Sequence, residues 1–323
     1  MRGHFIRAGA DRPVAAGEWE KPVAAGRRAT WRDYVEVTKP GITISNLMMT
    51  FGAFWLASGG QPDWAKLVVT LFGTYCAVVS GAILNNYFDR DRDILMPRTK
   101  NRALAQQRIA PHVALTLAIF MGVLSLCVLG GGLTAMGGNG GLPALLAFIG
   151  IVTYGLIYTG LKRYTALCTL FGGIPGSIPF VIGWTAVVGK MDYFAWVLFF
   201  VMFLWQMPHF LTLAVLKVED YKAGKFPMLP VVRGVEATIR QVFLYTAALL
   251  PASLFLVFSG LVGWLYVAVM TVLGVCFVVL AASGFWTKDT NAWAVRNFRF
   301  SLIYLTVWCL VMIIDAHPVT TTL

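Results

Sequence analysis

The chain has 323 residues, of which 58% are hydrophobic and 13% are charged, and its mean hydropathy is +0.71. A soluble domain carries about a quarter charged residues. This composition therefore excludes an ordinary water-soluble enzyme and indicates a polytopic membrane protein. The five cysteines lie in apolar runs without a metal-binding spacing, so we expect packing roles for them. They are Cys76, Cys127, Cys168, Cys276 and Cys309.

The first 30 residues are polar and lack the apolar core of a secretory signal. They also contain three acidic residues, which a mitochondrial presequence usually avoids. We expect residues 1–30 to form a disordered cytoplasmic tail.

Apolar runs of about 17–25 residues are long enough to cross a bilayer as helices. Nine such runs predict an all-α, nine-helix membrane domain over residues 31–316, with a short tail at 317–323 on the opposite side. The runs are 41–58, 65–88, 111–130, 143–160, 165–188, 193–216, 240–258, 261–283 and 299–316. Only Ser259–Gly260 separate the seventh and eighth, which predicts a tight hairpin. The glycine-rich stretch GGGLTAMGGNGG at 130–141 is expected to be a flexible external loop.

The net charge of +11 follows the expected topology. With nine spans, all but two of the 26 lysines and arginines fall on the side of the N-terminus, the exceptions being Lys66 and Lys190. The positive-inside rule therefore predicts a cytoplasmic N-terminus. The charge is explained by topology, so we expect no nucleic-acid partner.

Residues 85–102, NNYFDRDRDILMPRTKNR, place an acidic cluster at the end of the second expected helix. At about 100° per residue, Asn85, Asp89 and Asp93 lie on one face within roughly 80°, and Asp91 points elsewhere. Oxygen ligands in this arrangement suit Mg²⁺, which takes one or two carboxylates and completes its shell with water and phosphate oxygens. The alternative is a solvated helix end paired with its own arginines.

A second acidic pair, Glu219 and Asp220, ends the sixth expected helix on the same side of the membrane. Two such ends, each followed by basic loops, predict two facing sites that hold a diphosphate through Mg²⁺, with Asp220 as a further metal ligand. Basic side chains would meet the remaining phosphate charge. The candidates are Arg98, Lys100, Arg102, Lys162 and Arg163.

A charged head site beside an apolar bundle fits an allylic isoprenoid diphosphate. Its ionisation would leave a carbocation that aromatic faces stabilise. Tyr154, Tyr158, Trp184 and Trp205 are available for this, although packing is the commoner role of such residues.

Several stretches together resemble the UbiA-type intramembrane prenyltransferases, and among them the haem branch, the haem O synthases. The resemblance covers roughly residues 31–316. It is carried by TKPGIT (38–43), NNYFDRDRDILMPRTKNRAL (85–104), YTGLKRYT (158–165), GGIPGSIPFVIGW (172–184), WQMPHF (205–210), EDYKAGKFPMLPVV (219–232) and NFRFSLIYL (297–305).

The resemblance implies farnesyl transfer from farnesyl diphosphate to a vinyl carbon of protohaem IX (haem b), with water addition, giving haem O. It implies catalytic or Mg²⁺–diphosphate roles for Asn85, Asp89, Asp93, Glu219 and Asp220. It also makes His209 a candidate haem contact. The expected location is a bacterial inner membrane, with haem A synthase or oxidase assembly factors as further candidate partners.

The second acidic motif is short, because Leu216 and Val218 stand where other UbiA-type enzymes have aspartates. This favours a haem acceptor and leaves open whether a second Mg²⁺ binds. Ala103 stands where the family usually has proline. The alternatives are a UbiA-type enzyme with an aromatic quinone-precursor acceptor and, from another class, a transporter. Transporters place carboxylates near the bilayer midplane between internal repeats, whereas these carboxylates lie at helix ends.

Overall fold

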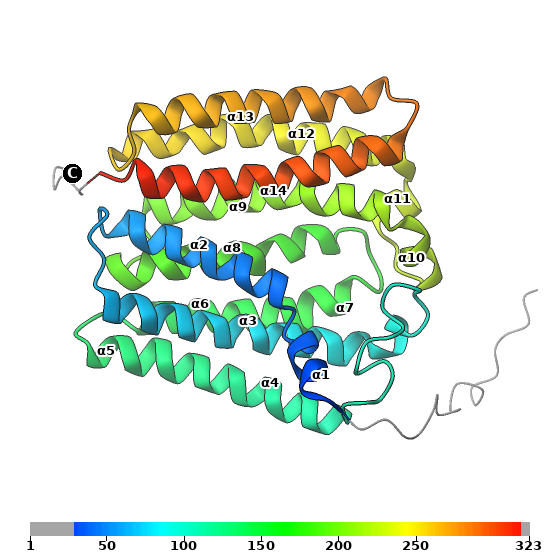
Figure 1. The fold of residues 1–323 in the computed structure, drawn as a ribbon, viewed down its shortest axis with the longest axis horizontal. Coiled ribbons are helices and arrows are strands. Elements are labelled where there is room, and N and C mark those ends of the chain that lie inside the picture. Colours follow the sequence, from blue (N-terminus) through cyan, green and yellow to red (C-terminus); the bar gives the residue numbers. More distant parts are fainter. Residues whose placement is uncertain (1–28, 318–323) are drawn as a thin grey trace, which may run out of the picture.

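The computed structural model describes residues 29–317, and this part of the chain is almost entirely helical. Long helices run side by side along one common axis, and short elements gather at one end (Figure 1). The predicted tail at 1–30 lies almost wholly outside the described residues, as does most of the predicted tail at 317–323.

The long helices follow the predicted runs. They are α2 (Pro40–Ala57), α3 (Trp64–Asp93), α4 (Pro111–Leu126), α6 (Gly141–Val152), α8 (Cys168–Val188), α9 (Tyr193–Leu216), α12 (Gly234–Leu254), α13 (Trp264–Ala282) and α14 (Thr290–Ile314). Several continue as 3₁₀ or π turns: η1 (Cys127–Gly132) and α5 (Leu133–Ala135) extend α4, η2 (Thr153–Tyr158) and α7 (Thr159–Leu161) extend α6, η3 (Phe255–Ser259) extends α12, and η4 (Ser283–Phe285) extends α13.

By length and composition, eight helical segments among the described residues can cross a membrane. The ninth predicted span is α2, which has 18 residues and carries Thr43, Asn46 and Thr50 on buried positions. It packs on α8, where the Thr50 hydroxyl donates to the Pro179 carbonyl at 3.1 Å. Its polar groups are thus satisfied inside the bundle, as a membrane environment requires.

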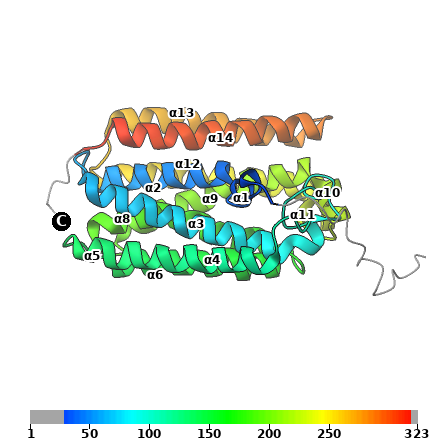
Figure 2. The same cartoon turned by 60° about the horizontal axis from the view of Figure 1, so that its bottom comes forward.

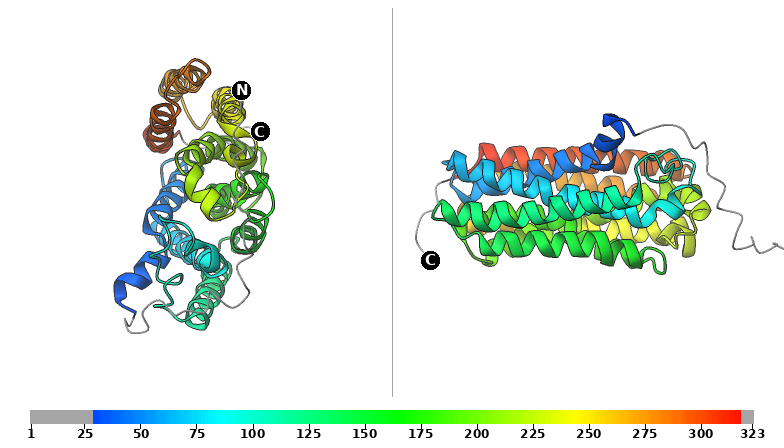
Figure 3. Two further views of the ribbon diagram at one scale, coloured as in Figure 1. Left: turned by 90° about the vertical axis from the view of Figure 1, so that its right-hand side faces the viewer. Right: turned by 90° about the horizontal axis from the view of Figure 1, so that it is seen from below.

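The helices are arranged in layers. In Figure 1, α12, α13 and α14 lie along one side and α3, α4 and α6 along the other, with α2, α8 and α9 between them. Figure 2 shows α13 and α14 on one side and α4 and α6 on the other. At one end lie α1 (Trp31–Val37), α10 (Val218–Ala223), α11 (Leu229–Val232) and the loop 94–110 (Figure 3). Both predicted acidic clusters therefore lie at this end of the bundle.

Two boundaries differ from the sequence prediction. The helix that was expected to stop near residue 130 continues to Ala135, so only residues 136–140 of the glycine-rich stretch form a loop. Helical hydrogen bonding satisfies the backbone where glycine propensity alone predicts a break. The last helix begins at Thr290 rather than near 299, because the Asp289 side chain accepts from the Ala292 N–H at 2.9 Å and caps it.

The predicted hairpin between the seventh and eighth spans is present. η3 ends at Ser259, and Gly260 follows with φ of 67°. This left-handed conformation suits glycine because it has no Cβ.

Candidate active site

The last turns of α3 bring the first acidic cluster together. Asn85, Asp89 and Asp93 are all buried and lie on one face, whereas the Asp91 side chain is 48% exposed. This confirms the predicted separation of Asp91 from the other three. Burying carboxylates is costly unless they are paired, so their partners decide the character of the site.

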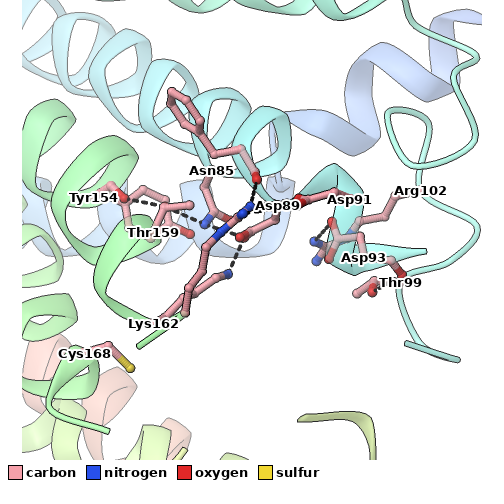
Figure 4. A network of polar contacts seen from close by, with 12 residues as sticks. Asn85, Asp89, Asp91, Asp93, Thr99, Arg102, Tyr154, Thr159, Lys162 and Cys168 are labelled. Atoms are coloured by element: carbon pink, nitrogen blue, oxygen red, sulfur yellow. Dashed lines mark hydrogen bonds and ion pairs between the residues drawn. The ribbon is translucent and has the colours of Figure 1, made fainter. Parts of the chain in front are cut away.

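Each of the three buried side chains has a cationic partner from a different segment, and Figure 4 shows two of these pairs, Lys162 with Asp89 and Arg102 with Asp93. Lys162, just after α7, pairs with Asp89 Oδ2. Arg102, in the loop 94–110, donates to Asp93 Oδ2 at 2.8 Å. Lys39, just before α2, donates to Asn85 Oδ1. Protein cations therefore offset the like charges of the two buried carboxylates.

Asn85 links the cluster to η2 and α7. Its amide donates to Asp89 Oδ2 and to the Thr159 hydroxyl, both at 2.9 Å. Thr159 in turn donates to the Tyr154 carbonyl at 2.8 Å. The α3 face is thereby fixed against the end of the α6 segment.

Lys39 was not singled out from the sequence, although it lies in the matching stretch TKPGIT. It is the N-terminal cap of α2 with a left-handed φ of 51°, which turns its side chain into the site. Its ammonium also contacts the Tyr154 hydroxyl at 3.3 Å. Burial, with Arg102 nearby, lowers the pKa of Lys39 to about 7. The available signal was a lysine directly before the first span.

The other predicted phosphate-binding residues lie differently. Arg163 forms two hydrogen bonds to Asp91, at 2.8 and 3.1 Å, so it holds the outer side of the α3 end. The Arg98 backbone N–H donates to Asp220 Oδ1 at 3.4 Å, and its side chain is exposed. Lys100 is exposed on the same loop.

The two residues of the second acidic pair, Glu219 and Asp220, lie in different surroundings. Asp220 lies against the loop 94–110 through its contact with Arg98. The Glu219 side chain is 80% exposed and pairs with Lys222 at 2.9 Å, so the structure does not bring it to the α3 cluster. Metal roles for Glu219 and Asp220 stay predictions.

The α3 cluster can accommodate Mg²⁺. Asp89 Oδ1 is buried and has no hydrogen-bond partner among the described residues. Residues 29–317 contain no group of three or more His, Cys, Asp or Glu side chains that could hold a metal by themselves. A metal that takes few protein oxygens and binds mainly through substrate phosphates and water fits this donor set.

An apolar cavity of about 510 Å³ adjoins the cluster. Tyr154 and Tyr158 line it nearest the cluster, with their rings stacked at 5.7 Å. Residues further along the bundle, including Met49, Ile182 and Leu305, also line it. A ligand with a charged head and a long apolar tail matches this combination of a polar cluster and an apolar cavity.

His209 lies on the wall of the same cavity. Its ring stacks between Trp205, at 5.0 Å, and Phe298, at 4.7 Å. The Ser301 hydroxyl donates to the Phe298 carbonyl at 2.7 Å, so its oxygen accepts from His209 Nδ1 at 2.8 Å. This arrangement favours the tautomer with the proton on Nδ1, which leaves the Nε2 lone pair for a ligand.

The two predicted tryptophans differ in position. Trp205 lines the cavity and donates through Nε1 to the Ser301 carbonyl at 2.8 Å. Trp184 is buried in the core, with its ring 6.0 Å from that of Phe194. Packing is thus the observed role of Trp184.

Comparison with solved structures identifies the fold. A digeranylgeranylglyceryl phosphate synthase structure superposes with a TM-score of 0.73 at 17% identity, covering 88% of this chain and 98% of that one. A UbiA homologue from Archaeoglobus fulgidus bound to GPP and Mg²⁺ gives 0.64 at 16% identity, covering 87% and 99%.

Sequence comparison identifies the family. The UbiA prenyltransferase family matches residues 46–303. A protohaem IX farnesyltransferase of Bacillus pumilus is 41% identical over 304 residues, covering 92% of this chain and 94% of that protein. One from Photorhabdus laumondii is 38% identical, covering 88% and 96%. The chain therefore belongs to the UbiA prenyltransferase family and, within it, to the group of the protohaem IX farnesyltransferases.

Proposed function

We propose that this protein transfers the farnesyl group of farnesyl diphosphate to a vinyl group of protohaem IX, with addition of water, and so produces haem O and diphosphate. The observation that carries this proposal is the buried Asn85–Asp89–Asp93 cluster, neutralised by three cations, beside an apolar cavity of about 510 Å³.

The diphosphate head would bind at the α3 cluster. Asn85, Asp89 and Asp93 would hold Mg²⁺, and Asp220 and Glu219 are the candidates for a second site. When bound, Mg²⁺ neutralises charge that develops on the departing diphosphate.

Protein cations would complete the diphosphate site. Lys162 and Arg102 are paired with Asp89 and Asp93. They lie where their side chains can turn to phosphate oxygens once the carboxylates face a metal. Lys39 has the same relation to Asn85. Arg98, Lys100 and Arg163 are outer candidates for this role.

The reaction begins with cleavage of the allylic C–O bond, whose electron pair leaves with the diphosphate. The stacked rings of Tyr154 and Tyr158 lie between the head site and the cavity, where their faces can stabilise the allylic cation. The vinyl carbon of protohaem attacks this cation and forms the new C–C bond. Water captures the cation left on the former vinyl group and then loses a proton, which gives the hydroxyl group.

Two observations favour protohaem as the acceptor. The curated relatives are named protohaem IX farnesyltransferases at about 40% identity. His209 lines the cavity, and histidine is a common haem ligand.

The same reasoning gives a location. The basic end of the bundle, which holds the site, would face the cytoplasm, with the protein in a bacterial inner membrane. Haem A synthase or oxidase assembly factors, which would use the product, are the candidate protein partners.

The test is direct. Membranes containing the protein are incubated with haem b, farnesyl diphosphate and Mg²⁺, and the extracted haems are analysed by liquid chromatography–mass spectrometry. We expect a new haem that is heavier by one farnesyl group plus one hydroxyl group. Unchanged haem b, with a folded protein that prenylates an aromatic quinone precursor instead, would overturn the acceptor and keep the prenyltransferase activity.

A further inference from the structure

Two arginines lie on the exposed surface of α14, within a helix that is long and apolar enough to cross the membrane. They are Arg296 and Arg299, three residues apart, and both are exposed. At 1.5 Å per residue, Arg299 lies roughly 13 Å along the helix from Thr290. The 25 residues of α14 span about 37 Å, against about 30 Å of hydrocarbon. In a membrane-spanning α14, Arg299 would thus lie deeper than a loop residue. An ionisable side chain at that depth is costly without a partner.

Neither arginine has an ion-pair or side-chain hydrogen-bond partner within residues 29–317. The ion pairs found among residues 29–317 include neither guanidinium. The side-chain hydrogen bonds at the neighbouring positions come from Asn297 and Ser301, and neither arginine takes part in them. A guanidinium on a helix of membrane-spanning length, without a carboxylate partner in the described part of the chain, can bind an anion supplied from outside the chain.

Arg299 stands beside the mouth of the cavity. Phe298 and Leu302, which flank it on α14, both line the cavity, and Leu302 is also 43% exposed. Across the gap, Ile42 of α2 lines the cavity and is 50% exposed. α2 and α14 diverge towards this end of the bundle (Figures 1 and 3). From the helical repeat, Arg299 points about 60° from Leu302, at the rim of this opening.

The rim is connected to His209. Phe298 stacks on the His209 ring at 4.7 Å, and Ser301 holds its Nδ1 at 2.8 Å. One turn of α14 therefore provides the two contacts that orient the imidazole, and the guanidinium of Arg299 lies on the outer side of the same turn. Trp205 and Phe298 cover the two faces of the His209 ring, so a ligand in the cavity would meet the edge of the ring and would extend its own outer edge towards Arg299.

We propose that Arg299, with Arg296 one turn nearer the basic end, binds the propionate carboxylates of the haem acceptor at the rim of the cavity. Haem is a flat apolar macrocycle with two carboxylates on one edge, and guanidinium groups bind carboxylates through two parallel hydrogen bonds. The inference rests on the proposed function, because it names the groups of protohaem that this rim recognises. It separates acceptor recognition on α14 from diphosphate binding on α3.

The test compares haem b with its dimethyl ester, which keeps the vinyl groups and the iron but lacks both carboxylate charges. Wild type, Arg299→Gln and Arg299→Lys are placed in nanodiscs of zwitterionic lipid, and each haem is titrated by its absorbance change. Arg240→Gln is the matched control, because Arg240 is an exposed arginine on the early turns of α12 and does not line the cavity.

We expect Arg299→Gln to bind haem b about tenfold more weakly than wild type, with an unchanged KM for farnesyl diphosphate. The dimethyl ester should bind equally to wild type and to Arg299→Gln. The affinity of Arg299→Lys for haem b should lie between those of wild type and Arg299→Gln, because lysine keeps the charge but cannot form two parallel hydrogen bonds. Arg240→Gln should match wild type for both haems.

Equal losses for haem b and its ester, or no loss for either, would overturn the inference. Equal losses are the result expected if Arg299 only anchors the helix to lipid phosphates. These results leave the proposed function intact as long as wild type converts haem b to a farnesylated product. Failure of wild type to convert haem b would instead refute the proposed acceptor.

Discussion

The Arg102 guanidinium donates to Asp93 Oδ2 at 2.8 Å, although the two residues are nine positions apart on opposite sides of a chain reversal. The Thr99 hydroxyl reinforces the turn by donating to the Asp93 carbonyl at 2.9 Å. The end of α3 and the loop that follows it therefore form one unit, which carries both the carboxylate and its counterion. A diphosphate that binds this unit would meet the Asp93 carboxylate and the Arg102 guanidinium together.

Asp89→Asn and Asp93→Asn should each reduce kcat/KM at least about 100-fold, with the protein still inserted and folded. Each change keeps the side-chain shape and removes the negative charge that we propose holds Mg²⁺. Steady-state kinetics over a Mg²⁺ series checks this. The matched control is Asp91→Asn on the exposed side of the same helix end, which should stay within about threefold of wild type. Full activity in either Asp89→Asn or Asp93→Asn would remove the assignment of the metal site.

His209→Phe should preserve the stack with Trp205 and Phe298 and remove both ring nitrogens. We expect about a tenfold loss of turnover with haem b and unchanged binding of farnesyl diphosphate. Ser301→Ala should have a smaller effect of the same kind, because it removes only the group that orients Nδ1. Haem absorbance titrations and kinetics of both variants test this. An unaltered haem spectrum and rate in His209→Phe would leave His209 with a packing role only.

Asp33 should hold α1 in place over a wide pH range. The Thr30 backbone N–H, at 2.8 Å, and Arg108, at 2.9 Å, outweigh the effect of burial and lower the pKa of Asp33 to about 2. Since the folded pKa lies below the ordinary value of 3.8, this stabilisation is complete above pH 4 and is lost as pH falls from 3.8 towards 2. Hydrogen–deuterium exchange of residues 30–37, corrected for intrinsic rates, should show constant protection from pH 8 to pH 4.

The variant Asp33→Asn should lower that protection at pH 7, by about 1 kcal/mol in opening free energy. Glu36→Gln is the control, because the Glu36 carboxylate is 46% exposed and lies 3.7 Å from Arg108. A loss of protection in Glu36→Gln as large as that in Asp33→Asn would contradict the role of the buried carboxylate.

Gly183→Ala should destabilise the bundle, because an added Cβ would lie 2.2 Å from the Thr50 carbonyl oxygen. This is backbone of α2, which cannot move aside as a flexible side chain does, so α2 and α8 would have to separate. We expect a cost of about 1–3 kcal/mol, visible as a lower Tm in detergent. Gly131→Ala, where a Cβ meets nothing within 4 Å, should leave the Tm nearly unchanged. Equal Tm values for the two variants would show that α2 and α8 tolerate a wider separation.

Local sequence patterns predicted the features that lie within one helix or one turn. The spacing of Asn85, Asp89 and Asp93 places them on one helical face because the α-helical repeat is a local property. The hairpin at Gly260 follows from a short polar break between two apolar runs. The start of α14 at Thr290 was missed because Arg296 and Arg299 interrupt the apolar pattern, while the capping side chain of Asp289 extends the helix.

The partners of the predicted site residues depended on tertiary structure. Lys39 and Asn85 are 46 residues apart in the chain, and Lys162 and Asp89 are 73 apart. No periodicity within a single helix relates such positions. The sequence determined that this is a helical membrane protein with acidic helix ends on the side that carries most lysines and arginines. Composition and helical periodicity can be read directly along the chain. Only the tertiary structure decided which cation meets which carboxylate, that Glu219 turns outward, and that His209 lines the cavity. These features depend on how helices that are distant in the sequence pack against one another.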